Sequence, residues 1–238
     1  MEIVAVDPFD DEGTAGWHAA YYAADTDGRP WAVPWTLEEV RADMQAEQKG
    51  RWAQLYALID GGEVVCAGLV EIPLLDNLKS AWIQVGTPPQ HGRRGYATRL
   101  LAHQEGQARA HGRSIFGSET AWPYESDGTG LAGAEFCRKH GYAVGQVSVQ
   151  RLLDLTAGPE RYAALAAEAA PHHAAYSLRS WAGDAPDELV ASLAALAATI
   201  TTEAPAGELE LEELTADVDV FREQEAALRA QGRTRYTT

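Results

Sequence analysis

Two glycines and two arginines, placed between a strand-like run and a helix-like run, are the residues best suited to chemistry. Residues 85–101 read V-G-T-P-P-Q-H-G-R-R-G-Y-A-T-R-L-L, so Gly92 and Gly95 bracket Arg93-Arg94. The first amides of a helix have no partner within the helix and carry the positive end of its dipole, so they bind phosphate. The pattern predicts a pyrophosphate-binding turn, although it is neither G-x-G-x-x-G nor a P-loop lysine motif. A surface turn without a ligand is the alternative.

The elements around this turn follow from local signals. Residues 80–87 are rich in β-formers and end at Pro88-Pro89, which cannot donate to a sheet. After the turn, apolar residues return at helical spacing, which predicts a helix over residues 97–111 ending before Gly112. Because a helical crossover usually joins parallel strands, residues 114–118 should run parallel to their neighbour.

Before the turn, the chain has the signals of an antiparallel meander. Residues 52–59 and 63–72 are β-rich runs joined by Asp60-Gly61-Gly62, a hairpin signal. A short strand over residues 2–6 and a helix over residues 14–24 precede them. The sequence T-L-E-E from Thr36 is a capping box that starts a second helix.

Residues 85–101 resemble the acetyl-CoA-binding motif of the GNAT superfamily of N-acetyltransferases, Gln/Arg-x-x-Gly-x-Gly/Ala after a strand. Here the first position is Gly92, which removes one side-chain contact but leaves the amides. The resemblance implies acetyl-CoA as co-substrate and an α/β (α+β mixed) fold, with a mostly antiparallel twisted sheet and flanking helices. The residues that it assigns to acetyl-CoA are Val85, Gly86 and Thr87 for pantetheine and carbonyl, and Gly92, Arg93, Arg94, Gly95, Tyr96, Ala97 and Thr98 for pyrophosphate.

A second stretch departs from the family pattern. Residues 130–142, G-L-A-G-A-E-F-C-R-K-H-G-Y, resemble N-x-x-A-x-x-F/L-Y-x-x-x-G-F, in which the Asn contacts the cofactor and the Tyr protonates the leaving thiolate. Those positions are Gly130 and Cys137. A thiol with a pKa near about 8.5 could supply the proton, or water could, and Cys137 could equally be a buried structural thiol. We expect a helix over residues 131–140 and closing strand material over residues 144–155.

A carboxylate at a strand end is the natural base for an amine acceptor, and Glu71 and Glu119 are the candidates, with Glu71 slightly preferred. Either could be an ordinary edge carboxylate. By resemblance to the family, the segments after the first strand wall the acceptor site. The aromatic residues expected there, for which plain packing is the alternative, are Tyr21, Tyr22, Trp31 and Trp35.

Composition limits the functional classes. The chain of 238 residues has 35 Asp and Glu against 19 Lys and Arg, a net charge of −16, which argues against nucleic-acid binding. The acidic surface would suit a cationic amine or serve only solubility. Two cysteines without a Cys-x-x-Cys pair, and an exposed His172-His173 pair, predict no metal site. The absence of a leader or long apolar run predicts a cytoplasmic protein that binds no membrane.

The last third of the chain repeats the opening of the first domain. Residues 160–170 form an alanine-rich linker helix before Pro171, residues 176–181 suggest a strand, and a helix starts near Asp187. L-E-E-L-T-A-D-V at residues 211–218 echoes L-E-E-V-R-A-D-M at residues 37–44. The arrangement resembles tandem GNAT proteins with a truncated second copy.

We therefore expect a GNAT domain over residues 1–155, a linker over 156–175 and an incomplete second domain over 176–238 without a glycine loop. The second domain would pack on the first, pair with another chain in a homo-oligomer, or come from a truncated reading frame. The predicted activity is transfer of an acetyl group from acetyl-CoA to a primary amine of a small molecule or peptide. The alternative is a noncatalytic acyl-CoA-binding or assembly module.

Overall fold

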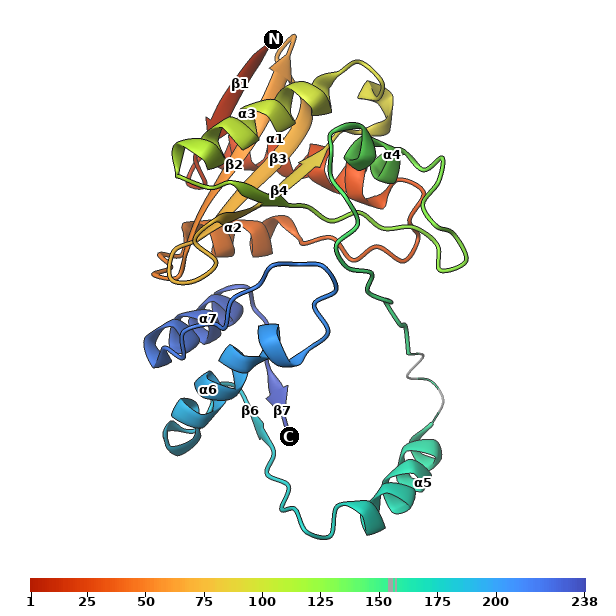
Figure 1. Ribbon diagram of the computed structural model, residues 1–238, viewed down its shortest axis with the longest axis vertical. Helices are drawn as coiled ribbons and strands as arrows, with labels where there is room; N and C mark the ends of the chain where they lie inside the picture. The colour runs from red at the N-terminus through yellow and green to blue at the C-terminus, as the bar shows by residue number, and fades with distance from the viewer. Residues whose placement is uncertain (154–155, 157) are drawn as a thin grey trace.

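The computed structural model describes residues 1–153, 156 and 158–238, and Figure 1 shows two groups of elements joined by a long connection. The first group comprises β1 (Glu2–Val6), α1 (Asp11–Thr26), α2 (Leu37–Gln45), β2 (Arg51–Asp60), β3 (Glu63–Pro73), β4 (Ser80–Gly86), η1 (Pro89–His91), α3 (Tyr96–Ala110), β5 (Ile115–Gly117) and α4 (Ala132–Lys139). We call this group the first copy.

The sheet of the first copy has the order β1-β2-β3-β4-β5. The pairs from β1 to β4 are antiparallel, and β4 pairs with β5 in parallel. Gly61 and Gly62 both have positive φ, 62° and 87°, which is the backbone that a tight hairpin between β2 and β3 requires. The meander, the hairpin and the parallel crossover strand are therefore confirmed.

Helices cover both faces of this sheet. In Figure 1, α3 crosses one face and α1 lies behind the strands. On the α3 face, Leu58, Val70 and Leu100 belong to one buried cluster; on the α1 face, Trp17 and Leu55 belong to another. Because both faces are covered, four successive residues of β2, from 55 to 58, are all buried. The sheet is thereby a rigid platform for the loop that follows β4.

The expectation of closing strand material over residues 144–155 is wrong for residues 144–153, which form no strand; residues 154 and 155 lie outside the described residues. The alternating valines satisfy the strand pattern, but a strand also needs a backbone partner. This segment hydrogen-bonds instead to residues 205–208. The Gly145 carbonyl accepts from the Glu208 amide at 2.8 Å, and the Gln146 side chain donates to the Pro205 carbonyl at 2.5 Å.

The connection carries the predicted linker helix, α5 (Pro159–Ala169), followed by η3 (Ala170–His172). No described residue of α5 is buried. The domain limits at residues 155 and 175 stay a prediction.

The second group, which we call the second copy, comprises β6 (Trp181–Ala182), α6 (Asp187–Glu203), α7 (Val218–Ala230) and β7 (Tyr236–Thr237). Its β6 and β7 pair antiparallel, as β1 and β2 do. The strand–helix–helix–strand order of the opening is therefore repeated, and the fold includes a partial second copy. The strand expected over residues 176–181 is reduced to its last residue and Ala182.

The repeat of L-E-E was aligned to the wrong element, because residues 211–217 are not helical. Helix α7 begins only after Asp217, whose side chain caps it by accepting from the amides of Asp219 and Val220. The preceding residues are held by the first copy instead, since Glu212 and Thr215 hydrogen-bond with Asn77 and Asp76. Tertiary contacts thus overrode a local helix signal.

The second copy packs on the first copy of the same chain, with α7 beside α2 (Figure 1). Lys49 forms an ion pair with Asp217 at 3.0 Å, and its amide donates to Glu223 at 2.9 Å. Packing of the second copy on the first domain is therefore confirmed, whereas pairing with another chain and a truncated reading frame stay predictions.

Candidate active site

The loop between β4 and α3 has the features of an anion-binding turn, and we call it the anion cradle. Gly95 is the N-cap of α3 with φ 82°, and Arg93 is also left-handed at φ 63°, a conformation that costs a non-glycine residue about 1–2 kcal/mol. No side-chain cap is found for α3 among the described residues, so its first amides have no capping partner there. Arg93 and Arg94 are exposed beside them. Strained backbone, free amides and two guanidinium groups at one point suit a phosphate ligand.

Two carboxylates in the β2–β3 hairpin anchor this cradle from behind. The Tyr96 hydroxyl donates to Asp60 at 2.7 Å, and the buried His91 ring lies 3.0 Å from Glu63. Tyr96 is therefore an anchor by its side chain and offers only its amide to a ligand. Neither anchor was expected from the sequence, because residue 60 meets residue 96, and residue 63 meets residue 91, only through the fold.

The remaining residues expected at the cofactor lie near the cradle, but not all by their side chains. Thr87 donates its hydroxyl to the Cys66 sulfur at 3.2 Å, while the Thr98 hydroxyl lies 3.1 Å from Nε2 of His140 after α4. Burial raises the pKa of Cys66 to about 11, so this thiol stays protonated. Thr87 thus offers its backbone, as do Val85 and Gly86.

Strands β4 and β5 form a fork. They pair only as far as Trp82 and Gly117, and a Cβ at residue 117 would meet the Trp82 ring at 2.8 Å, so glycine is required for the contact. Beyond this point, the next four residues of β4, 83–86, keep β3 on one side and have no described strand on the other. The fork leaves a stretch of strand edge between its base and the cradle.

A cavity of ≈ 480 Å³ adjoins the fork. We call it the acceptor cavity, after the acceptor site that the sequence predicts. Its aromatic and charged lining residues are Trp17, Tyr21, Trp35, Asp43, Arg51, Glu71, Trp82 and Glu119, joined by Ile83, Gln84 and Ser118 from the two arms of the fork. The fold therefore brings both predicted carboxylates, with Tyr21 and Trp35, to one cavity. Trp31 and Tyr22 do not line it.

The two predicted carboxylates differ in their partners. Arg51 pairs with both Glu71 and Asp43, the latter at 2.6 Å. Burial alone would lower the pKa of Arg51, but these two carboxylates outweigh it and raise the pKa. Glu119 is exposed, and no ion pair to it is found among the described residues. Within the described residues, Glu71 therefore has a cationic partner and Glu119 has none, while the preference for Glu71 stays a prediction.

The aromatic wall is held by α1. The Trp17 and Tyr21 rings stack at 5.2 Å, and the Trp17 indole donates to the Gly68 carbonyl at 3.0 Å. The Trp35 amide donates to the Tyr21 hydroxyl at 3.1 Å. Sequence reasoning missed Trp17, Asp43, Arg51 and Trp82 as cavity residues, because each belongs to an element whose local pattern explains it as packing or strand.

Cys137, the position of the expected acid, lies on α4 and is half-buried. Burial raises its pKa, so the thiol stays protonated near neutral pH. It is not among the described lining residues of the acceptor cavity. Its neighbour Tyr142 donates to Glu105 of α3 at 3.1 Å, which places this part of the chain against α3.

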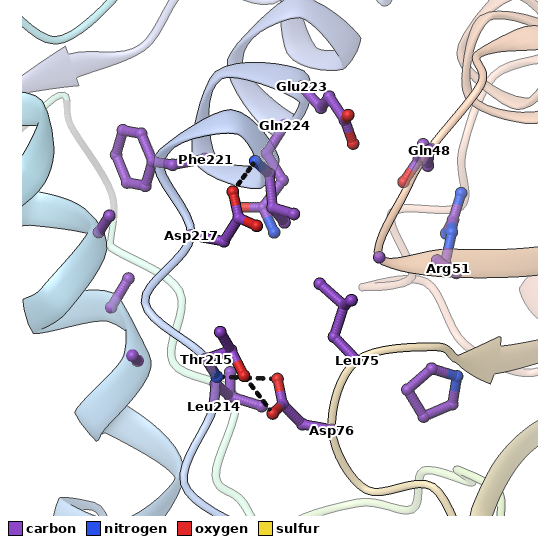
Figure 2. Close-up of a pocket in the computed structure, with 16 residues that line it drawn as sticks. Gln48, Arg51, Leu75, Asp76, Leu214, Thr215, Asp217, Phe221, Glu223 and Gln224 are labelled. Atoms are coloured by element: carbon purple, nitrogen blue, oxygen red, sulfur yellow. Dashed lines mark hydrogen bonds between the residues drawn. The ribbon is translucent and has the colours of Figure 1, made fainter.

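A second cavity, of ≈ 500 Å³, lies between the two copies (Figure 2). Gln48, Arg51 and Leu75 line it from the first copy, and α7 lines it from the second. Arg51 belongs to the lining of both cavities. The Asp43–Arg51–Glu71 cluster therefore lies between the acceptor cavity and the second copy.

The described residues offer neither a cluster of metal ligands nor a membrane-spanning helix. No group of three or more His, Cys, Asp or Glu side chains in the described part of the chain could hold a metal ion. Within the same residues, no helix is long and apolar enough to cross a membrane.

The sequence matches no protein-family model and no curated protein. Among solved structures, a tandem GNAT protein from the clavulanic acid biosynthesis pathway is similar with a TM-score of 0.71 and 21% identity, over 99% of this chain and 68% of its own. Aminoglycoside N-acetyltransferase AAC(6')-Iy, in complex with CoA, matches 64% of this chain and 99% of its own with a TM-score of 0.44 and 12% identity. The chain has the fold of a tandem GNAT acetyltransferase, with a partial second copy.

Proposed function

We propose that the chain transfers an acetyl group from acetyl-CoA to a primary amine bound in the acceptor cavity. The observation that carries the proposal is the fork: one strand edge joins the anion cradle at residues 92–98 to a cavity with an unpaired carboxylate. Pyrophosphate would bind the cradle, and pantetheine would follow the free edge of β4 at Val85, Gly86 and Thr87. The thioester carbonyl would then lie at the base of the fork.

The reaction needs a base at this point. The bound ammonium first loses one proton, and its neutral nitrogen then attacks the carbonyl carbon to form the C–N bond. As the C–S bond breaks, the nitrogen loses a second proton and the thiolate gains one. We assign the first proton to Glu119, directly or through a water. Glu71, held by Arg51, would position the acceptor instead. Water is the simplest donor to the thiolate, with Cys137 as the alternative.

The acceptor cavity favours a cationic, planar amine. Its lining carries three carboxylates against one guanidinium, and four aromatic rings. A protonated amine gains from negative charge and from aromatic faces. Tryptamine and tryptophan form a suitable probe pair, because they differ only by a carboxylate that the cavity should repel. We expect tryptamine to be the better acceptor.

The first test is titration of acetyl-CoA into the wild-type and Gly95→Glu proteins. Glutamate at 95 adds a strained backbone and a negative charge at the cradle, so affinity should fall about a hundredfold or more. Gly106→Glu is the matched control, since Gly106 lies exposed on the same helix with open space around it. No binding by the wild-type protein, or equal binding by both variants, would reject the cradle.

The second test separates catalysis from binding. In Glu119→Gln, kcat for tryptamine should fall about a hundredfold while the Kd of acetyl-CoA stays unchanged. Glu125→Gln, an exposed carboxylate outside the cavity lining, should behave as wild type. Equal kcat in the two variants would remove Glu119 from the mechanism.

A noncatalytic acyl-CoA-binding module is the second candidate, and the location of Cys137 outside the described cavity lining favours it. Both candidates require the cradle, so acetyl-CoA binding alone does not separate them. Release of free thiol that depends on an amine does. Binding without any such release across cationic, neutral and peptide amines would favour the module.

A further inference from the structure

The second copy reaches the wall of the acceptor cavity through one arginine. Arg233, between α7 and β7, donates to Glu39 with Nε at 2.7 Å and pairs with the same oxygen through a terminal nitrogen at 2.6 Å. Its guanidinium also lies over the Trp35 ring, 5.6 Å from the centroid. Trp35 lines the cavity, and Glu39 lies in the first turn of α2. A side chain of the second copy therefore contacts Trp35 and Glu39, which belong to the wall of the acceptor cavity and to α2 in the first copy.

Both carboxylate oxygens of Glu39 accept hydrogen bonds. Its Oε2 accepts from the Thr36 amide at 2.8 Å as half of the capping box, while its Oε1 takes Arg233. The backbone hydrogen bond from Thr36, together with the hydrogen bond and charge of Arg233, lowers the pKa of Glu39. Arg233 thus binds to the group that fixes the start of α2, the helix that carries Asp43 to the cavity.

Few hydrogen bonds and ring contacts hold this wall among the described residues. Residues 32–36 have no regular structure, and Trp35 is 37% exposed. Apart from Arg233, its contacts come from α1, through Tyr21 and through His18, which lies 2.8 Å from the Trp35 carbonyl. Both of these contacts fix the backbone. Among these contacts, the cation–π contact of Arg233 is the one that reaches the indole ring.

We propose that Arg233 is a positioning residue of the acceptor site, through which the second copy orients Trp35 and the first turn of α2. This inference rests on the proposed function for the identity of the cavity, but its structural part is testable without turnover. It gives the partial second copy a role although it carries no glycine loop in this chain: it completes a site that lies in the first copy.

The matched control is Lys49. Its ion pair with Asp217 also joins the two copies, and its side chain is 50% exposed against 43% for Arg233. Lys49 does not line the acceptor cavity in the described structure. Lys49→Ala therefore weakens docking of the second copy without removing a support of the wall, whereas Arg233→Ala does both.

The test compares amide hydrogen exchange in Arg233→Ala, Lys49→Ala and wild type. We expect exchange of residues 35–45 to rise about tenfold in Arg233→Ala only, and residues 85–98 to stay unchanged in all three. In addition, the KM for tryptamine should rise about fivefold to tenfold in Arg233→Ala, with kcat and the KM for acetyl-CoA within about twofold.

Equal exchange of residues 35–45 in the two variants would overturn the proposal, because docking alone would then explain the effect. So would a fall in kcat without a change in the KM for tryptamine. If wild type turns over no tryptamine, the proposed acceptor class fails, and the exchange experiment still decides the role of Arg233.

Discussion

The two copies repeat one order of elements but bury very different amounts of apolar surface. Leu55, Leu58 and Val70 in the first copy are at most 1% exposed, whereas Leu196 and Ile200 in the second are 67% and 62% exposed. The buried apolar side chains of the second copy that the structure describes are small, namely Ala185, Val190, Ala194 and Ala198. Its α6 and α7 have no covering sheet comparable to the five strands of the first copy.

The second copy is held instead by polar contacts. Glu225 is 3% exposed, accepts from the Ala185 amide at 2.7 Å and pairs with Arg222 at 2.7 Å. Across the interface, Asp76 binds Thr215, and Lys49 binds Asp217. The two copies therefore share an order of elements but are stabilised by different kinds of interaction. The first copy should be stable through its core, and the second through its docking.

The largest effect should come from the first-copy core. Leu58→Ala removes a fully buried side chain between β2 and α3, so the free energy of unfolding should fall by about 2–5 kcal/mol. Leu196→Ala, in the exposed part of α6, should change it by less than about 0.5 kcal/mol. Urea denaturation of both variants measures the difference, and similar losses would refute the contrast between the copies.

The next effect is alkaline destabilisation of the first copy. Burial raises the pKa of Cys66 to about 11, above its value near about 8.5 in the unfolded chain. The protonated thiol therefore favours the folded state fully below pH 8.5, and this advantage is lost as the pH rises from about 8.5 through about 11. Over that window, wild type should lose about 2–3 kcal/mol more stability than Cys66→Ala. Parallel pH profiles would reject the assignment.

Within the second copy, Glu225→Gln should destabilise by about 1–3 kcal/mol, because it weakens a buried acceptor of the Ala185 amide and leaves Arg222 without its buried partner. The effect should be confined to hydrogen exchange of residues 181–237. Glu188→Gln, which removes an exposed ion pair with Arg179, is the control and should leave exchange unchanged. Faster exchange in β2 and β3 would mean that the copies unfold together.

The smallest effect should be that of salt. Raising NaCl from about 0.05 M to about 0.5 M shortens the Debye length to a few ångströms and screens the exposed interdomain pairs. Exchange should accelerate a few-fold in residues 181–237 and stay constant in residues 51–72. Equal exchange at both salt concentrations would show that apolar residues between the copies, such as Leu75 and Val220, hold the interface.

The elements of the first copy were predictable because each has a local cause. Asp60-Gly61-Gly62 makes the hairpin, T-L-E-E makes the capped start of α2, and Gly95 makes the left-handed N-cap of α3. The errors fall where a long-range partner decides. Residues 211–217 carry a helix signal but bind Asp76 and Asn77, and residues 144–153 carry a strand signal without a strand partner.

The candidate site divides in the same way. Its anion cradle is a run of consecutive residues, so the sequence alone determined its residues, its glycines and the direction of its helix dipole. The acceptor cavity is lined by residues of α1, α2, β2, β3, β4 and the end of β5. These residues are far apart in the sequence, and local sequence patterns do not predict which of them come together. Only the tertiary structure decided that Arg51 pairs with Glu71, that Glu119 has no ion pair among the described residues, and that Arg233 crosses from the second copy to Trp35.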